Sequence, residues 1–239
     1  MRFAVAGLER GGELDIEPDA VIIAGYTGRD RVKVQHHIDE LAAIGVPPPA
    51  SFPAYWLQPP WLATSSSTVV VTGANTSGEA ELALVADGDD LYVTLASDHT
   101  DRAAEAIDIE LSKAICPVPV ASEAWPIADV DGRWDDLVLR SWIVELGGSD
   151  DDPDDEEVLY QDDVCSSLVP PLDLLAGLPH ARPHRFVMLT GTVPVRGDIR
   201  PARRFRAELH DPHRDRSIHL AYDIETLSRL THPARRTAP

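Results

Sequence analysis

The sequence has few basic residues. Lys and Arg together number 21 in a chain of 239 residues, against 40 Asp and Glu, so the formal net charge is −19. Lysine occurs only at Lys33 and Lys113. Most of such a surface would repel a polyanion, and no long run of basic residues is present to offset this. The composition therefore argues against nucleic acid as a partner.

Long hydrophobic runs are also absent, and cysteine is rare. Apolar runs such as 20–25 are far shorter than the roughly 20 residues that cross a bilayer, and the N-terminal apolar stretch is too short for a secretory signal. We therefore expect a cytoplasmic protein with no membrane partner. The two cysteines, Cys116 and Cys165, lack the spacing of a zinc site or a disulfide framework.

Turn-forming residues are frequent, and the apolar segments between them are short and β-branched. With 20 prolines and 15 glycines, this pattern predicts an α+β fold that is mostly β. Hydrophobic residues make up 44% of the chain, which is enough for a core. Strands are expected over 20–24, 68–73, 78–86, 91–96, 137–146, 158–161, 186–192, 205–209 and 217–222, and helices over 29–44 and 102–114. We expect one domain over 1–230, with a solvated acidic hairpin insert at 148–157 and a disordered tail at 231–239.

The strand expected over 78–86 carries two carboxylates. Residues two apart share a face of a strand, so Glu79 and Glu81 point the same way. On a strand fit for burial they would repel each other unless a cation neutralised them, and Mg²⁺ and Mn²⁺ prefer such oxygen ligands. The alternative is a strand end that emerges into solvent.

Asp98 is a candidate third oxygen ligand. It follows the strand at 91–96, which an acidic turn at 87–90 joins to the first strand in a predicted hairpin. We expect Asp98 to lie beyond the region that faces Glu79 and Glu81. Its alternative role, shared with Thr100, is to cap the helix that begins near Arg102.

Two further segments carry polar groups suited to catalysis. His37 and Glu40 are three residues apart on a predicted helix, so the carboxylate could orient the imidazole as a base. A solvated helix face, or a pairing of His36 with Glu40, remains an alternative. The hydroxyl and backbone N–H groups of 191–192, after a predicted strand, could bind a carboxylate. The sequence contains no nucleophile elbow, P-loop or dinucleotide-binding glycine motif.

Taken in order, these segments resemble the fumarylacetoacetate hydrolase superfamily over about residues 20 to 225. The segments are GYTGRDRVKVQHHIDEL, VPPPASFPAYWLQPP, GEAELALV, SDHTDR, LSKAICP and LTGT. The resemblance implies a mixed β-roll with a few flanking helices, and homodimers are common in the superfamily. It also implies Mg²⁺ or Mn²⁺ as the cofactor. By this resemblance the metal ligands are Glu79, Glu81 and Asp98, the catalytic residues are His37, Glu40 and Lys113, and the substrate-binding residues are Tyr26, Gln58, Arg102, Gly191 and Thr192.

The resemblance predicts a metal-dependent enzyme whose substrate is a 2-oxo acid, a 1,3-dicarbonyl compound or a related dicarboxylate. The reaction would be hydrolysis of a C–C bond, or decarboxylation, hydration or tautomerisation, and the sequence does not choose among them. Gln58 stands where the superfamily has a lysine, and an arginine-rich segment at 193–205 replaces its usual glycine loop. These departures favour the alternative, a metal- or metabolite-binding protein that has the fold without catalysis.

Overall fold

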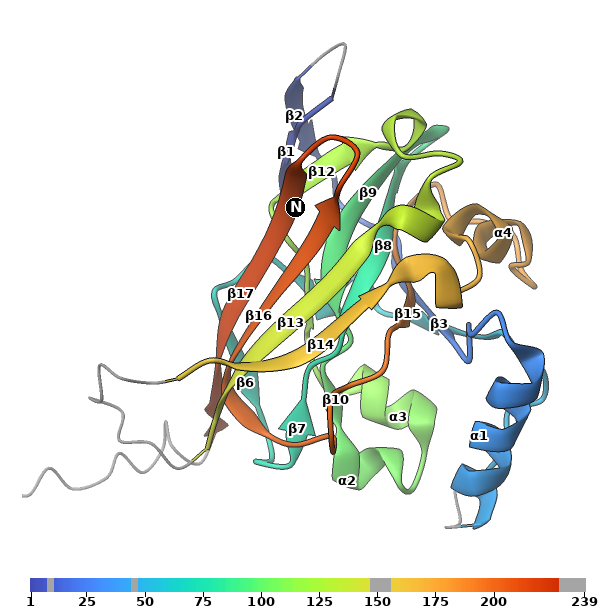
Figure 1. The fold of residues 1–239 in the computed structure, drawn as a ribbon, viewed down its shortest axis with the longest axis vertical. Helices are drawn as coiled ribbons and strands as arrows, with labels where there is room; N and C mark the ends of the chain where they lie inside the picture. Colours follow the sequence, from blue (N-terminus) through green and yellow to red (C-terminus); the bar gives the residue numbers. More distant parts are fainter. Residues whose placement is uncertain (8–10, 44–46, 147–155, 228–239) are drawn as a thin grey trace, which may run out of the picture.

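The computed structural model describes residues 1–7, 11–43, 47–146 and 156–227, and the side chains of His37, Glu40 and Leu41 lie outside this description. The predicted tail at 231–239 and most of the predicted acidic insert also lie outside it. Figure 1 shows the described part as two β-sheets packed together, with the helices at one side and one end. The fold is the expected mostly β arrangement of α+β type.

The larger sheet has eight strands in the order β2-β1-β12-β9-β8-β15-β3-β4. Its strands are β1 (Arg2–Val5), β2 (Gly12–Asp15), β3 (Ala20–Gly25), β4 (Ala54–Gln58), β8 (Ala80–Asp87), β9 (Asp90–Ser97), β12 (Glu123–Pro126) and β15 (Arg185–Thr192). Sequence analysis predicted β3, β8, β9 and β15, and it missed β1, β2, β4 and β12. Three of these four missed strands lie at the two edges of the sheet or beside an edge strand.

The smaller sheet has five strands in the order β14-β13-β16-β17-β6. Its strands are β6 (Thr68–Val71), β13 (Val138–Glu145), β14 (Val158–Val164), β16 (Ala202–Asp211) and β17 (Arg216–Thr226), all of which were predicted at least in part. Two short pairs complete the β structure: β7 (Thr76–Ser77) with β10 (Thr100–Asp101), and β5 (Ala63–Thr64) with β11 (Val118–Pro119).

The helices are short except for the first. They are α1 (Arg31–Ala43), α2 (Arg102–Glu105), α3 (Ile109–Ala114) and α4 (Pro171–Ala176), with 3-10 turns η1 (Pro60–Leu62), η2 (Ile127–Asp129), η3 (Trp134–Asp136) and η4 (Cys165–Ser167). The single helix predicted over 102–114 is therefore two helices. Asp108 divides it, because this residue is extended and its carboxylate accepts a hydrogen bond from Leu111 N, which starts α3. Within the described ranges, no helix has the length and apolar character of a membrane span.

Alternation along β8 separates two apolar cores. Leu82 and Leu84 belong to the core between the two sheets, whereas Ala83 and Val85 belong to a second core on the other face of the larger sheet. Burying both faces leaves little space for charge in the middle of β8. The carboxylates accordingly lie at its ends, with Glu79 and Glu81 at the start and Asp87 at the last position.

The hairpin of β8 and β9 turns where the sequence predicted, at 87–90. Asp87 pairs with Asp90, which leaves a turn of two residues with Gly88 at a φ of 65°. The same register pairs Ala80 with Ser97, so the next residues along, Glu79 and Asp98, face each other. The expectation that Asp98 lies beyond the region facing the two glutamates was therefore wrong, because counting back from the turn at 87–90 already places Asp98 opposite Glu79.

Candidate functional site

Glu79, Glu81 and Asp98 lie together at the open end of the β8–β9 hairpin. Glu79 N donates to Asp98 O at 3.2 Å, and Asp98 N donates to Glu79 O at 3.0 Å. Because directly paired residues share a face, the three carboxylates lie on the same face of the sheet. Glu81 and Asp98 are only 3% and 5% exposed.

Two basic residues from the following helices contact these carboxylates. Lys113, on α3, donates from Nζ to Asp98 Oδ2, and both side chains are buried. Arg102, at the start of α2, donates from Nη2 to Glu79 Oε2 at 2.7 Å and from Nη1 to Glu105 Oε2 at 2.8 Å. Glu105 did not figure in the sequence prediction. Four carboxylates and two basic groups give this cluster a formal charge of −2.

The electrostatics of the cluster follow from burial and from these partners. Burial and then the nearby Asp98 charge raise the pKa of Glu81 well above its usual value, although Lys113 and the Gly191 N–H oppose the change. Burial also acts to raise the pKa of Asp98, but the Lys113 ammonium outweighs it and the pKa is lowered. Burial acts to lower the pKa of Lys113, and Asp98 outweighs it and raises that pKa. Lys113 is therefore a cation at neutral pH.

The capping alternative for Asp98 and Thr100 is wrong. Asp101 is the N-cap of α2, and its carboxylate accepts from the backbone N–H groups of Ala103 and Ala104 at 3.0 and 3.1 Å. Asp98 instead accepts from the Thr100 hydroxyl at 3.2 Å and from Lys113. The aspartate that caps the helix and the aspartate that joins the cluster are thus different residues.

Gly191 and Thr192 support β8 in this structure. Gly191 N donates to Glu81 Oε2 at 2.6 Å. Its φ is 102°, and a Cβ at this position would lie 1.8 Å from Thr27 Oγ1, so there is room only for glycine. Thr192 Oγ1 donates to Ala80 O at 2.7 Å and accepts from Gln161 Nε2 at 2.7 Å. The hydroxyl hydrogen that we expected to bind a substrate carboxylate is therefore directed at the backbone instead.

Tyr26 lies beside the cluster and Gln58 does not. Burial raises the pKa of Tyr26, with a further contribution from the Glu105 charge, and its ring centroid lies 6.4 Å from that of Trp56. Lys113 Nζ lies 5.6 Å from the centroid of the same Trp56 ring. Gln58 is buried on β4, and the strand register places it level with Val85, four residues from Glu81 along the sheet.

His37 and Glu40 lie on α1, where the helix spacing was correctly predicted, but their side chains lie outside the described residues. The proposed dyad and its alternative with His36 therefore remain predictions. Both cysteines are free and buried, as the sequence suggested.

Sequence analysis missed a buried polar chain behind the cluster. His99 Nδ1 lies 3.0 Å from Tyr222 Oη, and His99 Nε2 lies 3.0 Å from Thr76 Oγ1. Ser97 Oγ lies 2.9 Å from the same tyrosine oxygen. Burial lowers the pKa of His99 to about 4. The signal in the sequence was a histidine next to Asp98 in an alternating strand, which places its side chain on the opposite face.

Gln161 was also missed, and it ties three strands to the site. Its Oε1 accepts from Ala80 N at 2.9 Å and from Ser141 Oγ at 2.7 Å, while its Nε2 donates to Thr192 Oγ1 and to Val193 O. Gln161 therefore fixes the start of β8, where Glu79 and Glu81 lie. Nothing in the local sequence set Gln161 apart, because Asp162 and Asp163 follow it in β14 and are exposed.

The donor set fits a hard divalent cation in its chemistry. The candidate ligands are carboxylate oxygens, and two of the carboxylates, those of Glu81 and Asp98, are buried. The formal charge of −2 equals the charge that a divalent ion would neutralise. Among the described residues, no three His, Cys, Asp or Glu side chains are already arranged around a common point. Lys113 and Arg102 contact Asp98 and Glu79 instead, so ion binding would require these side chains to share or exchange partners.

Comparison with known proteins gives the same fold. The structure is similar to 2-keto-3-deoxy-D-arabinonate dehydratase in its apo form (TM-score 0.63, 16% identity, 88% of this chain and 74% of that chain). It is similar to the same dehydratase complexed with magnesium and 2,5-dioxopentanoate (TM-score 0.61, 17% identity, the same coverage). It is also similar to a fumarylacetoacetate hydrolase family protein from Yersinia pestis CO92 (TM-score 0.57, 16% identity, 91% of this chain and 96% of that chain).

A search of curated proteins found no match to the sequence. The model of the DUF2848 family, described as proteins of unknown function, matches residues 24–222. This range includes both strands of the hairpin, both basic residues of the cluster and all of α1. The chain therefore belongs to the DUF2848 family and has the fold of fumarylacetoacetate hydrolase family proteins.

Proposed function

We propose that this protein is a metal-dependent enzyme that acts on a 2-oxo acid or a 1,3-dicarbonyl compound. The observation that carries the proposal is the group of three carboxylates on one face of the β8–β9 hairpin, beside a buried lysine, with a formal charge excess of −2. The fold likeness to a dehydratase solved with magnesium and a dioxo acid supports Mg²⁺ or Mn²⁺ at Glu79, Glu81 and Asp98.

Each residue of the site has a separate role in the proposed reaction. A divalent ion at the carboxylates would supply positive charge beside a substrate carbonyl. Lys113 adds a fixed charge, because Asp98 keeps it protonated, and it is therefore suited to stabilise developing negative charge rather than to act as a nucleophile. Tyr26 and Lys113 both lie beside the Trp56 ring, so we assign Tyr26 to the same substrate pocket. His37, oriented by Glu40, is the proposed base.

Arg102 has a different role from the one first expected. Its guanidinium is held by Glu79, Glu105 and Ser77, and the Glu79 charge followed by that of Glu105 raises its pKa against the effect of burial. We propose that Arg102 positions Glu79. Hydrolysis of a C–C bond, decarboxylation, hydration and tautomerisation all remain open as the reaction.

The test of the metal site is calorimetric titration of chelator-stripped protein with Mg²⁺ and with Mn²⁺. Glu81→Gln retains the shape and the acceptor for Gly191 N but removes the charge, so we expect saturable binding to the wild type and its loss in the variant. Asp162→Asn is a matched control, because Asp162 is a partly exposed carboxylate on β14. Unchanged affinity in Glu81→Gln would contradict the ligand assignment.

The second candidate is a metal- or metabolite-binding protein without catalysis, which the contacts of Thr192 favour, since its hydroxyl hydrogen is already engaged. Turnover assays with oxaloacetate, acylpyruvates and hydroxydienoates separate the two. Under the enzyme proposal, His37→Ala abolishes turnover and leaves metal affinity unchanged. Metal binding without turnover of any of these compounds would favour the second candidate. The homodimer also remains a prediction, for sedimentation to test.

A further inference from the structure

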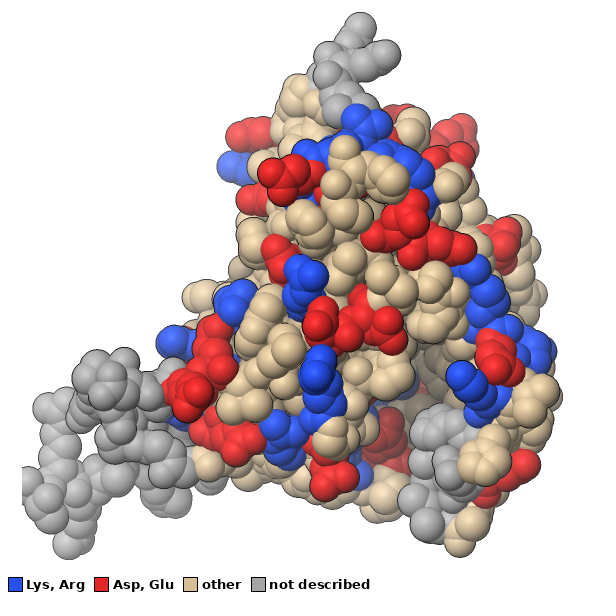
Figure 2. Space-filling model, viewed as in Figure 1, with Lys and Arg blue, Asp and Glu red and all other residues tan. Residues whose placement is uncertain are grey.

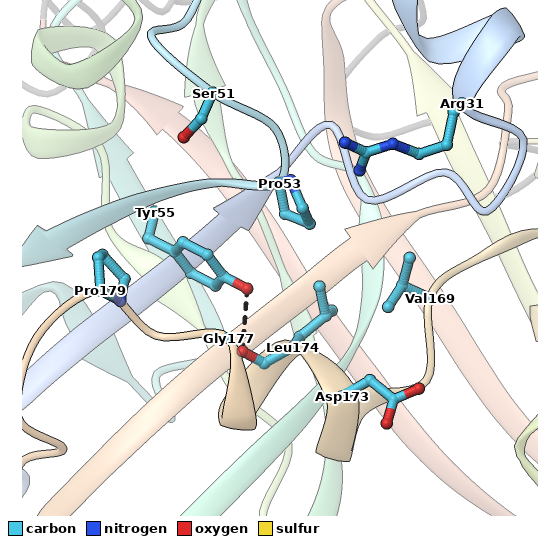
Figure 3. A pocket seen from close by; sticks show the side chains of 9 residues that line it. All are labelled: Arg31, Ser51, Pro53, Tyr55, Val169, Asp173, Leu174, Gly177 and Pro179. Carbon is cyan, nitrogen blue, oxygen red and sulfur yellow. Dashed lines mark hydrogen bonds between the residues drawn. The ribbon is translucent and has the colours of Figure 1, made fainter.

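A cavity of about 300 Å³ lies away from the carboxylate cluster. It is bounded by the start of α1, the segment that leads into β4, and α4 with its flanking residues (Figure 3). Its lining residues are Arg31, Ser51, Pro53, Tyr55, Val169, Asp173, Leu174, Gly177 and Pro179. We call this space the α1–α4 cavity.

Strand β4 separates the cavity from the candidate active site. Tyr55 packs against the core between the two sheets, and its hydroxyl donates to Leu174 O at 2.9 Å. Trp56, the next residue, packs against the second core and lies beside Lys113. Successive side chains of a strand point to opposite faces, so the α1–α4 cavity and the carboxylate cluster lie on opposite sides of the sheet.

The cavity carries one positive and one negative group. The Arg31 guanidinium carbon lies 3.9 Å from the centroid of the Phe52 ring, which restricts its orientation. Asp173, on α4, supplies the carboxylate. Within the described part of the chain, neither Arg31 nor Asp173 has an ion-pair partner within 4.0 Å. Both charges are thus available to a ligand.

The rest of the lining is largely apolar. Pro53, Val169 and Pro179 provide aliphatic surface, and Ser51 provides a hydroxyl. A simple anion would be attracted by Arg31 but repelled by Asp173. A simple cation would be attracted by Asp173 but repelled by Arg31. A ligand with both charges and an apolar portion satisfies the whole lining. The volume is at the lower end for small-molecule sites, which suits one amino acid rather than a nucleotide.

We propose that the α1–α4 cavity binds a free α-amino acid with an apolar side chain. The ligand carboxylate pairs with the planar Arg31 guanidinium, which can donate two parallel hydrogen bonds. The ligand ammonium pairs with Asp173, and the side chain packs against the two prolines and Val169. This site is separate from the proposed metal site and does not depend on it.

The test is calorimetric titration of the full chain with L-leucine, L-methionine and L-phenylalanine, alongside isoamylamine and isocaproate. These last two molecules resemble leucine without its carboxylate or without its amine. We expect saturable binding of at least one amino acid, and at least about tenfold weaker binding of the two analogues, because each loses one charge-assisted contact.

Variants assign the binding to this cavity. Arg31→Met and Asp173→Asn each weaken amino-acid binding by about tenfold or more, and Asp89→Asn, at an exposed carboxylate in the β8–β9 turn, leaves it unchanged. Arg31 and Asp173 are exposed, so thermal melting should show both variants folded. Glu81→Gln should not affect this binding.

Three results would overturn the proposal. The first is the absence of saturable binding for all three amino acids. The second is binding that survives both Arg31→Met and Asp173→Asn, which would place the ligand elsewhere. The third is isocaproate binding as tightly as leucine with only Arg31→Met weakening it, which would make the cavity an anion site.

Discussion

Two regions of this protein are rich in ion pairs, and they differ in burial. At the end of the β8–β9 hairpin, the side chains of Lys113 and Asp98 are each 8% exposed. On the outer face of the five-stranded sheet, Arg204 pairs with Asp223 at 2.7 Å, and those side chains are 55% and 48% exposed. Figure 2 shows this outer face with basic and acidic side chains interspersed.

The distances between the paired atoms do not distinguish the two regions. Arg102 and Glu79 in the cluster are 2.7 Å apart, the same distance as Arg204 and Asp223. What differs is the surrounding medium, because a charge removed from water loses solvation that only its partner can replace. Breaking an exposed ion pair costs little stability, because water solvates both charges. Removing one partner of a buried pair leaves the other charge uncompensated. The cluster is therefore the region where single substitutions should have large effects.

The largest effect is expected for Lys113→Met. This change leaves Asp98 buried without its cation, and it should lower the free energy of unfolding by about 3–5 kcal/mol. Urea denaturation would measure this change. Adding Asp98→Asn should recover part of the loss, because the remaining buried charge is removed. A loss below about 1 kcal/mol would mean that the pair behaves like a surface pair.

His99→Gln should change how stability depends on pH. Burial lowers the pKa of His99 to about 4 from 6.5, so the unfolded chain binds more protons between these values. The stability due to neutral His99 is present above pH 6.5 and is lost as pH falls towards 4. The shift corresponds to roughly 3 kcal/mol.

Urea denaturation of wild type and His99→Gln at several pH values would measure this dependence. The difference in unfolding free energy between the two proteins should shrink as the solution is acidified. His180→Gln is the control, because His180 is exposed. A difference that stays constant with pH would show that the pKa of His99 is the same in the folded and unfolded states.

Glu81→Gln should raise stability in metal-free protein while it removes metal binding. Burial and the Asp98 charge raise the pKa of Glu81. The folded state then binds more protons than the unfolded state, and stability falls as pH rises through the interval between the two pKa values. Glutamine removes that dependence and retains the acceptor for Gly191 N. Melting temperatures with chelator present, measured from pH 5 to 8, would reveal a gain that increases with pH.

The smallest effect is expected on the outer face. Arg204→Met breaks an exposed pair and should change the free energy of unfolding by about 0–1 kcal/mol, with less effect at high salt. Urea denaturation at low and high ionic strength would measure it. A loss comparable to that of Lys113→Met would show that burial does not explain the difference between the two regions.

The hairpin at the site could be predicted from the sequence, including the place of its turn, although Asp98 was placed too far along it. Alternation of apolar residues gave both strands and the shared face of Glu79 and Glu81. The position of Asp98 follows from the place of the turn, because two or four turn residues within 87–90 give the same register and put residue 98 opposite residue 79. The helix after it was predicted as one piece, because Asp108 is an ordinary polar residue until its carboxylate is seen to cap α3.

The sequence could not predict which residues contact the charged side chains of the site. Lys113 and Asp98 were both singled out, but no local pattern indicates that they contact each other. Glu105 and Gln161 were missed, since isolated polar residues in a helix or strand are usually solvated. The contact of Gly191 N with Glu81 joins residues 110 positions apart, and only the pairing of β15 with β8 brings them together.

The sequence by itself determined the class of fold, half of the strands of the larger sheet, the strands of the smaller sheet at least in part, and which acidic residues lie on buried β structure. It could do so because alternation and turn residues act over a few positions along the chain. The tertiary structure alone decided which cation neutralises which carboxylate, where polar groups are desolvated, and that the α1–α4 cavity exists on the other side of β4. These properties depend on contacts between distant segments, and solvation is set by what packs around a group rather than by its neighbours in the chain.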